Sequence, residues 1–155
     1  PRLVAQPVAD VFVAPTAEQR AHLKVNDNTP VKYRRVQLRC GTHVLSVAEN
    51  WYVPERLTPE MNQLLGTTTT PFGKAVEGLE PWRQTLAARM LWSPLPADWH
   101  SATAPYPSHA DRTLVMPEAL FEHRALLYTR EQQPFAEVVE VYQRGLLDFP
   151  APTLH

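Results

Sequence analysis

Two pairs of strand-like segments, each joined by a short turn, restrict the possible fold most. Residues 31–40 alternate with the period of a strand, and residues 44–53, rich in β-forming residues, follow after a tight turn. Residues 123–129 and 134–142 form a second pair across a polar turn. Such pairs are typical of antiparallel hairpins. The sequence therefore predicts an α+β fold with a mostly antiparallel sheet.

Short helices and irregular segments complete the predicted elements. Thr16 and Gln19 form a capping-box signature before a helix over residues 17–25. Thr58 followed by Pro59 starts a second short helix. Residues 1–30 are expected to form an N-terminal arm and the first helix, and the apolar stretch 8–13 of this arm is an edge strand or a packed segment. The remaining predictions are a strand over 84–92, a Pro-rich loop over 93–107 and a short helix over 116–121.

A net charge near zero narrows the classes of partner. The 155-residue chain carries 15 Lys and Arg residues against 16 Asp and Glu residues, a formal net charge of -1. This balance excludes the basic footprint of proteins that bind nucleic acid or anionic lipid. The length predicts a single domain over residues 1–155, which we expect to be a monomer or a weak homodimer. Without a long apolar run or a signal-peptide pattern, we expect no membrane partner and a cytoplasmic location.

Several kinds of catalytic site are excluded by composition and spacing. A single cysteine, Cys40, leaves neither an intramolecular disulfide nor a Cys-rich zinc site. The six histidines show no metal-ligand spacing and stand beside no acidic cluster. The five glycines never cluster into a phosphate-binding loop, and no serine lies in a nucleophile elbow. The sequence therefore predicts no metal and no cofactor.

Two ionisable residues within predicted strands are the main candidates for chemistry. Arg35 has apolar and aromatic neighbours, which favours pairing with a ligand carboxylate; the alternative is an internal ion pair or an exposed edge-strand position. Glu140 lies in the apolar segment 138–142, where a carboxyl group suits proton exchange or a hydrogen bond to a ligand hydroxyl group. The alternative is that Glu140 pairs with Arg35 or Arg124. Glu137 lies on the opposite strand face, where we expect it to be solvated.

Three short motifs occur in an order and spacing known from one enzyme family. The segment 33–54 combines a strand arginine, a turn glycine and a closing proline. Thr70-Pro71-Phe72-Gly73 forms a compact turn, and residues 134–142 form a final strand in which a Glu is followed by apolar residues. Together these motifs resemble the chorismate lyases (chorismate pyruvate-lyases). The resemblance runs over residues 30–145.

The resemblance implies an antiparallel sheet of about six strands, with helical flaps over an internal ligand site. It implies that Arg35 binds the substrate carboxylate, that Phe72 and Gly73 contact the ring, and that Glu140 faces the ring hydroxyl group and serves proton transfer. The family reaction eliminates pyruvate from chorismate to leave 4-hydroxybenzoate, without metal or cofactor. Because aromatisation drives that reaction, the enzyme needs mainly orientation, a dry cavity and one proton-handling carboxyl group.

The sequence departs from the family pattern at the site itself. Phe72 stands where members of the family often carry Leu, which reshapes the ring slot. One extra residue lies between Pro134 and Glu140, so Glu140 points inward only if the strand contains a bulge, and Val139 takes its place otherwise. The Pro-rich segment 93–107 has no counterpart in the family.

The function has two main interpretations. One is a cofactor-free lyase that acts on chorismate or a related cyclic acid, with Arg35 and Glu140 as catalytic residues. The other is a non-catalytic sensor of small molecules, because the UTRA effector-binding domains of transcription regulators look like the same fold. A lyase-like protein that has lost activity or changed substrate is a third. In each case the expected partner is a small anionic molecule.

Overall fold

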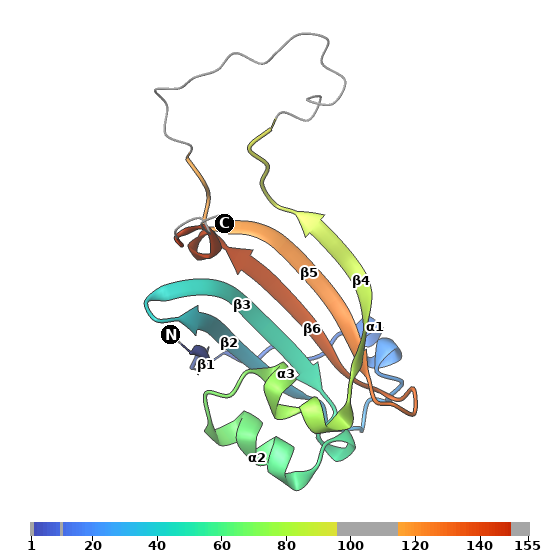
Figure 1. Ribbon diagram of the computed structural model, residues 1–155. Coiled ribbons are helices and arrows are strands. Elements are labelled where there is room, and N and C mark those ends of the chain that lie inside the picture. Colours follow the sequence, from blue (N-terminus) through green and yellow to red (C-terminus); the bar gives the residue numbers. More distant parts are fainter. Residues whose placement is uncertain (1, 10, 96–114, 150–155) are drawn as a thin grey trace.

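The computed structural model describes residues 2–9, 11–95 and 115–149 (Figure 1). Its six-stranded sheet has the order β1-β2-β3-β6-β5-β4, and every neighbouring pair is antiparallel. The strands are β1 (Leu3–Pro7), β2 (Lys32–Cys40), β3 (His43–Tyr52), β4 (Trp82–Met90), β5 (Ala119–Tyr128) and β6 (Pro134–Gln143). The helices are α1 (Ala17–His22), α2 (Pro59–Thr67) and α3 (Phe72–Ala75), with 3-10 turns η1 (Pro54–Arg56), η2 (Glu77–Leu79) and η3 (Arg144–Leu147).

Most predicted elements are confirmed, including both hairpins and the capping box at Thr16. The edge strand of the N-terminal arm is β1, which pairs with β2 and ends at Pro7. The expected position of this strand is wrong, because the described residues of the segment 8–13 form no strand. The short helix predicted over 116–121 is wrong, because β5 begins at Ala119. Phe121 pairs with Tyr142 of β6, with ring centroids 5.5 Å apart, so strand pairing outweighs the local helix signal. From residue 96 on, the predicted Pro-rich loop lies outside the described residues.

Strand register assigns side chains to the two faces of the sheet. Val36 of β2 lies opposite Ala48 of β3, and Ala48 lies opposite Glu140 of β6. Arg35 and Glu49 belong to the next row. Because successive side chains of a strand point to opposite faces, these two rows lie on opposite faces. We call the face with Val36, Ala48 and Glu140 the flap face, and the other the α1 face; α2 and α3 lie on one side of the sheet and α1 on the other (Figure 1).

One apolar cluster attaches α2 and α3 to the flap face. Tyr52 of β3 and Ala136 of β6 share this buried cluster with Leu65 of α2 and Phe72 of α3. Phe135 also joins it, at the point where the β5–β6 register shifts by one residue. The bulge expected between Pro134 and Glu140 is therefore present. None of the helices within the described residues is long and apolar enough to cross a membrane.

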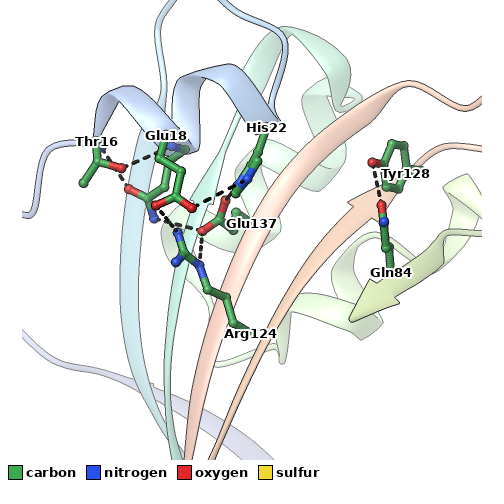
Figure 2. A network of polar contacts seen from close by, with 8 residues as sticks. Thr16, Glu18, His22, Gln84, Arg124, Tyr128 and Glu137 are labelled. Carbon is green, nitrogen blue, oxygen red and sulfur yellow. Dashed lines mark hydrogen bonds and ion pairs between the residues drawn. The ribbon is translucent and has the colours of Figure 1, made fainter. Parts of the chain in front are cut away.

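A buried carboxylate attaches α1 to the other face. Glu137 of β6 is 0% exposed and accepts hydrogen bonds from Arg124 Nε at 2.6 Å and His22 Nδ1 at 2.8 Å (Figure 2). Gln19 Nε2 donates to the same carboxylate at 3.4 Å. The prediction that Glu137 is solvated is wrong, because Arg124 and α1 together cover it and supply its donors. Arg124 thus pairs with Glu137 rather than with Glu140.

Candidate functional site

A cavity of about 260 Å³ lies between the flap face and α3. Sheet residues such as Val36 and Val138 form its floor, and Phe72, Gly73 and Val76 form its roof. Most of the surrounding side chains are apolar. The polar side chains that line the cavity are Asn50, Arg83 and Glu140.

Aromatic packing fixes the roof of the cavity. Pro71 precedes α3, and its restricted backbone suits the position before the first turn. Phe72 is buried, and its ring centroid lies 5.6 Å from that of Tyr52 and 6.5 Å from that of Phe135. These contacts hold Phe72 against the sheet and place the exposed Gly73 at the edge of the cavity.

The loop before α3 is held by a buried arginine. Arg34 of β2 is 8% exposed, and its Nη2 donates to the carbonyl oxygens of Thr70 at 3.0 Å and Thr68 at 3.4 Å. A hydrogen bond of 2.8 Å also joins the hydroxyl groups of Thr68 and Thr70. Burial lowers the pKa of the Arg34 guanidinium below its usual value. Within the described residues no carboxylate forms an ion pair with Arg34.

Arg34 and Asn50 bring unpartnered donors together on the flap face. The two residues lie opposite each other in the β2–β3 register. Arg34 Nε, Arg34 Nη1 and Asn50 Nδ2 are buried and have no hydrogen-bond partner among the described residues. Buried donors are nearly always hydrogen-bonded in folded proteins, because removing them from water without a partner is costly. Asn50 lines the cavity, and Arg34 adjoins it at the neighbouring strand position without lining it.

Glu140 is the acidic group of the cavity. Its Oε1 accepts a hydrogen bond from Ser46 Oγ at 2.6 Å, and its Oε2 accepts one from the Tyr142 hydroxyl at 3.3 Å. Ser46 of β3 is 1% exposed, so its buried hydroxyl group fixes the orientation of the Glu140 carboxylate. Burial, and then the nearby Glu140 carboxylate, raise the pKa of Tyr142. The arrangement leaves a carboxylate that can accept further hydrogen bonds from a ligand.

Arg83 of the edge strand β4 lines the cavity and forms a hydrogen-bonded group with His123 and Thr85. Arg83 of β4 is exposed, and its Nη2 donates to His123 Nδ1 at 2.8 Å. The other ring nitrogen, His123 Nε2, lies 3.1 Å from Thr85 Oγ1. His123 lies opposite Glu140 in the β5–β6 register, so this group adjoins the Glu140 side of the cavity.

A larger hollow of about 580 Å³ lies at the sheet edge, between β1 and the segment around Thr69. Arg2 and Lys74 give it positive charge, but both residues are exposed, and Lys74 Nζ already pairs with Glu77 at 2.6 Å. No side-chain donor or acceptor that is buried and unpartnered lines this hollow within the described residues. The smaller cavity is therefore the stronger candidate. In the described part of the chain, no group of three or more His, Cys, Asp or Glu residues is placed to hold a metal ion.

The structure brings together three of the four site residues predicted from the sequence. Phe72, Gly73 and Glu140 line the same cavity. Arg35 does not join them: it lies opposite Glu49 on the α1 face, one position away from the row of Glu140. The expectation that Arg35 and Glu140 serve one ligand is corrected, because side chains one residue apart on a strand point to opposite faces.

Sequence reasoning missed the two donors on the flap face. Arg34 belongs to the same alternating set as Val36 and Leu38, the apolar positions of its strand, and this pattern was the available signal. Asn50 carried no such signal. Its significance depends on lying opposite Arg34, which is a property of the strand register and not of the local sequence.

Comparison with known proteins adds one sequence relative. No family model matches the sequence. The chain is 48% identical over 136 residues to the uncharacterized protein y4mC of Sinorhizobium fredii (strain NBRC 101917 / NGR234). The match covers 88% of this chain and 57% of that protein. The chain thus spans little more than half the length of the curated relative it matches.

Solved structures with a similar fold come from transcription regulators. One is the ligand-binding domain of a protein assigned to the GntR family of transcriptional regulators from Bordetella bronchiseptica, with a TM-score of 0.57, 16% identity, and coverage of 99% of this chain and 90% of that chain. Another is the effector domain of PhnF from Mycobacterium smegmatis, with a TM-score of 0.58, 9% identity, and coverage of 92% and 82%. The fold is that of these effector domains.

At such low identity this similarity establishes the fold alone. The expected α+β fold with a six-stranded antiparallel sheet is confirmed, and the effector domains of transcription regulators share this fold. The specific resemblance to chorismate lyases stays a prediction.

Proposed function

We propose that this chain is a sensor domain that binds a compact molecule with an oxyanion group in the cavity between the flap face and α3. Arg34 and Asn50 donate hydrogen bonds to an oxyanion group of the ligand. Phe72 and Gly73 cover its apolar part, and Glu140 accepts a hydrogen bond from its other end. Binding, rather than chemical conversion, is the activity.

The unpartnered donors of Arg34 and Asn50 carry this proposal. Each buried polar group without a partner costs about 1–3 kcal/mol. A ligand oxyanion that accepts from these nitrogens offsets that cost, and a guanidinium group matches two oxygens at once. The hydrogen bonds to Thr68 and Thr70 use only Nη2 of Arg34, so the structural role of this residue leaves its other donors unsatisfied.

The size and walls of the cavity limit the ligand. A volume of about 260 Å³ lies below the range of about 300–1,000 Å³ that is usual for sites of drug-sized molecules. A monocyclic acid, a short-chain acid or a single sugar acid fits this limit. Buried apolar residues such as Val36 and Phe72 favour a ligand with an apolar body.

Sensing is favoured over catalysis by the kind of domain that shares this fold. The similar structures include a ligand-binding domain and an effector domain of transcription regulators. The sequence relative is longer than the matched region, since 57% of it is covered. We propose that the domain supplies effector binding within a longer protein.

The test is a ligand screen, followed by a comparison of the unsubstituted protein with a variant whose cavity is filled by a larger side chain. Small carboxylates and sugar phosphates are screened for an increase in Tm, and the affinity of each active compound is measured by titration calorimetry. Val138→Trp fills the cavity floor, whereas Val139→Trp places the same ring on the α1 face. The proposal predicts that Val138→Trp loses binding and that Val139→Trp keeps it. Equal affinity of both variants and the unsubstituted protein would overturn it.

A lyase acting on chorismate is the second candidate function. The observation that favours it is that Glu140 and Phe72 line one cavity, as the resemblance implies. In that case Arg34, and not Arg35, is the residue on the correct face to hold the substrate carboxylate. The protein is incubated with chorismate, and pyruvate and 4-hydroxybenzoate are separated by chromatography. Products that disappear in Glu140→Gln support the lyase; a rise in Tm with 4-hydroxybenzoate and no product supports the sensor.

A further inference from the structure

We infer that the ligand carries a protonated amine, which binds the Glu140 carboxylate, so that the cavity is built for a compact zwitterion. This inference rests on the proposed function, and it names the ligand class of the same site. The oxyanion of the zwitterion lies toward Arg34 and Asn50, and its ammonium group lies toward Glu140.

The first argument is the charge at Glu140. Its two hydrogen-bond donors, Ser46 Oγ and the Tyr142 hydroxyl, are both neutral. No Lys, Arg or His nitrogen in the described ranges forms an ion pair with it. The two hydroxyl groups orient this partly exposed carboxylate but supply no positive charge to it. A cation is the partner that such a carboxylate favours.

The buried carboxylate on the opposite face provides a comparison within the same strand. Glu137, three residues before Glu140, pairs with Arg124 Nε at 2.6 Å and with His22 Nδ1 at 2.8 Å. Where β6 holds a carboxylate for structure, the chain therefore supplies basic partners. At Glu140 it supplies hydroxyl groups and an adjoining cavity instead.

The nearest basic side chain of the cavity is held elsewhere. Arg83 also lines the cavity, but its Nη2 donates to His123 Nδ1 at 2.8 Å. A guanidinium group can only donate, so His123 Nδ1 is the acceptor of this hydrogen bond. Arg83 is exposed as well, so water solvates its guanidinium group. The charge of Arg83 reaches the neighbouring Tyr142, but Arg83 forms no ion pair with Glu140 in the described part of the chain, so the carboxylate can still pair with a cation from the ligand.

The two ends of the site are spaced for a small zwitterion. Asn50 lies opposite Val138 in the β3–β6 register, and Glu140 lies two residues further along β6. Two residues along a strand span about 7 Å and neighbouring strands lie about 5 Å apart, so the two Cα atoms are about 8 Å apart. Side chains that rise from these two positions can contact opposite ends of a molecule that lies across the cavity floor, such as a benzene ring with a carboxylate and an aminomethyl group in para positions. Its ring also suits the apolar floor and the Phe72 roof.

Three compounds that share one ring and one carboxylate test the inference. They are 4-(aminomethyl)benzoate, 4-(hydroxymethyl)benzoate and 4-methylbenzoate, with affinities measured by titration calorimetry at pH 7. We expect 4-(aminomethyl)benzoate to bind about tenfold more tightly than the hydroxymethyl compound, because a charged donor strengthens the hydrogen bond to a carboxylate. The methyl compound is expected to bind most weakly.

Glu140→Gln and Glu122→Gln separate the role of Glu140 from a general effect of charge. Glu122 lies on β5, opposite Val141 on the α1 face, and pairs with Arg89. Glu140→Gln is expected to abolish the preference for the aminomethyl compound, and Glu122→Gln to retain it. Circular dichroism checks that both variants are folded, and the comparison of the three compounds on the unsubstituted protein does not depend on either variant.

Two sets of results would overturn the inference. Equal affinities for the three compounds, or a preference for the aminomethyl compound that persists in Glu140→Gln, would mean that Glu140 does not bind an ammonium group. Failure of all three to bind would exclude this ligand class. In either case the proposed sensor function stands if another compound from the screen binds and Val138→Trp prevents its binding. It falls only if no compound binds in a manner that depends on Val138.

Discussion

Arg34 and Asn50 lie opposite each other on β2 and β3, and together they hold three buried donor nitrogens that have no hydrogen-bond partner among the described residues. The same guanidinium group holds the loop before α3 through the carbonyl oxygens of Thr68 and Thr70. Arg34 thus joins the loop before α3 to the strand position beside Asn50, which lines the cavity. An acceptor bound to Arg34 would therefore touch the residue that positions the roof.

Arg34→Met should weaken binding of a carboxylate ligand by about 10- to 100-fold, since it removes charge-assisted hydrogen bonds but keeps an apolar stem. Arg35→Met is the matched control, because the adjacent arginine lies on the α1 face. Titration calorimetry with the tightest compound of the screen measures both. If Arg34→Met bound that compound as well as the unsubstituted protein did, Arg34 would not contact the ligand.

Glu137→Ala should lower the free energy of unfolding by about 3 kcal/mol, because it leaves Arg124 without its closest carboxylate and opens space beneath α1. Arg124 is partly exposed, which keeps the loss below the largest values known for buried pairs. Glu131→Ala, in the exposed turn before β6, should change stability by less than about 0.5 kcal/mol. Urea unfolding followed by circular dichroism measures both, and equal stabilities would contradict the role of Glu137 in holding α1.

Tyr33 should resist ionisation at high pH. Burial and the hydrogen bond to the Glu49 carboxylate raise the pKa of Tyr33 from 10.0 to about 12. A pKa that is higher in the folded state than in the unfolded state means that folding favours the neutral, protonated form of the phenol. This contribution to stability is full below about pH 10 and is lost as the pH rises toward 12. The ultraviolet titration of the unsubstituted protein, minus that of Tyr33→Phe, should show this ionisation near pH 12; a midpoint near pH 10 would disprove the effect of Glu49.

Gly145→Ala should be strongly destabilising. A Cβ atom at Gly145 of η3 would overlap the carbonyl oxygen of Val44 in β3, so backbone must move. Gly66→Ala in α2 is the control: a Cβ there meets nothing within 4 Å, and the change should stabilise the helix by about 0.5–1 kcal/mol. Thermal unfolding of both variants checks this. A Tm for Gly145→Ala equal to that of Gly66→Ala would show that η3 does not pack tightly on β3.

The hairpins could be predicted because their signals are local. In each of the hairpins β2–β3 and β5–β6, the alternating strands and the turn between them are adjacent in the sequence. The start of β5 could not be found this way, because its pairing with β6 decides the conformation of Phe121. Glu137 was misjudged for a similar reason. Its hydrogen-bond donors come from α1 and β5, and one of them, Gln19, is 118 residues away along the chain, so the local sequence around Glu137 does not reveal them.

The site was predictable up to the choice of face. Phe72, Gly73 and Glu140 were identified and line one cavity. The arginine was misplaced by one residue, and in a strand this shift moves the side chain to the other face of the sheet. The apolar partners Val36 and Leu38 indicated the correct set, but only the register with β3 and β6 shows which set faces the cavity.

The central claim is that the cavity beneath α3 is the ligand site, and methyl chemical shifts test it most directly. The tightest compound of the screen is titrated into protein with labelled Val and Ala methyl groups. We predict that the methyl resonances of Ala48, Val76 and Val138, which line the cavity, shift with the ligand. Those of Val47 and Val139, on the α1 face, should stay in place. Shifts confined to Val47 and Val139, or to Val4 beside the hollow at the sheet edge, would contradict the assignment of the site.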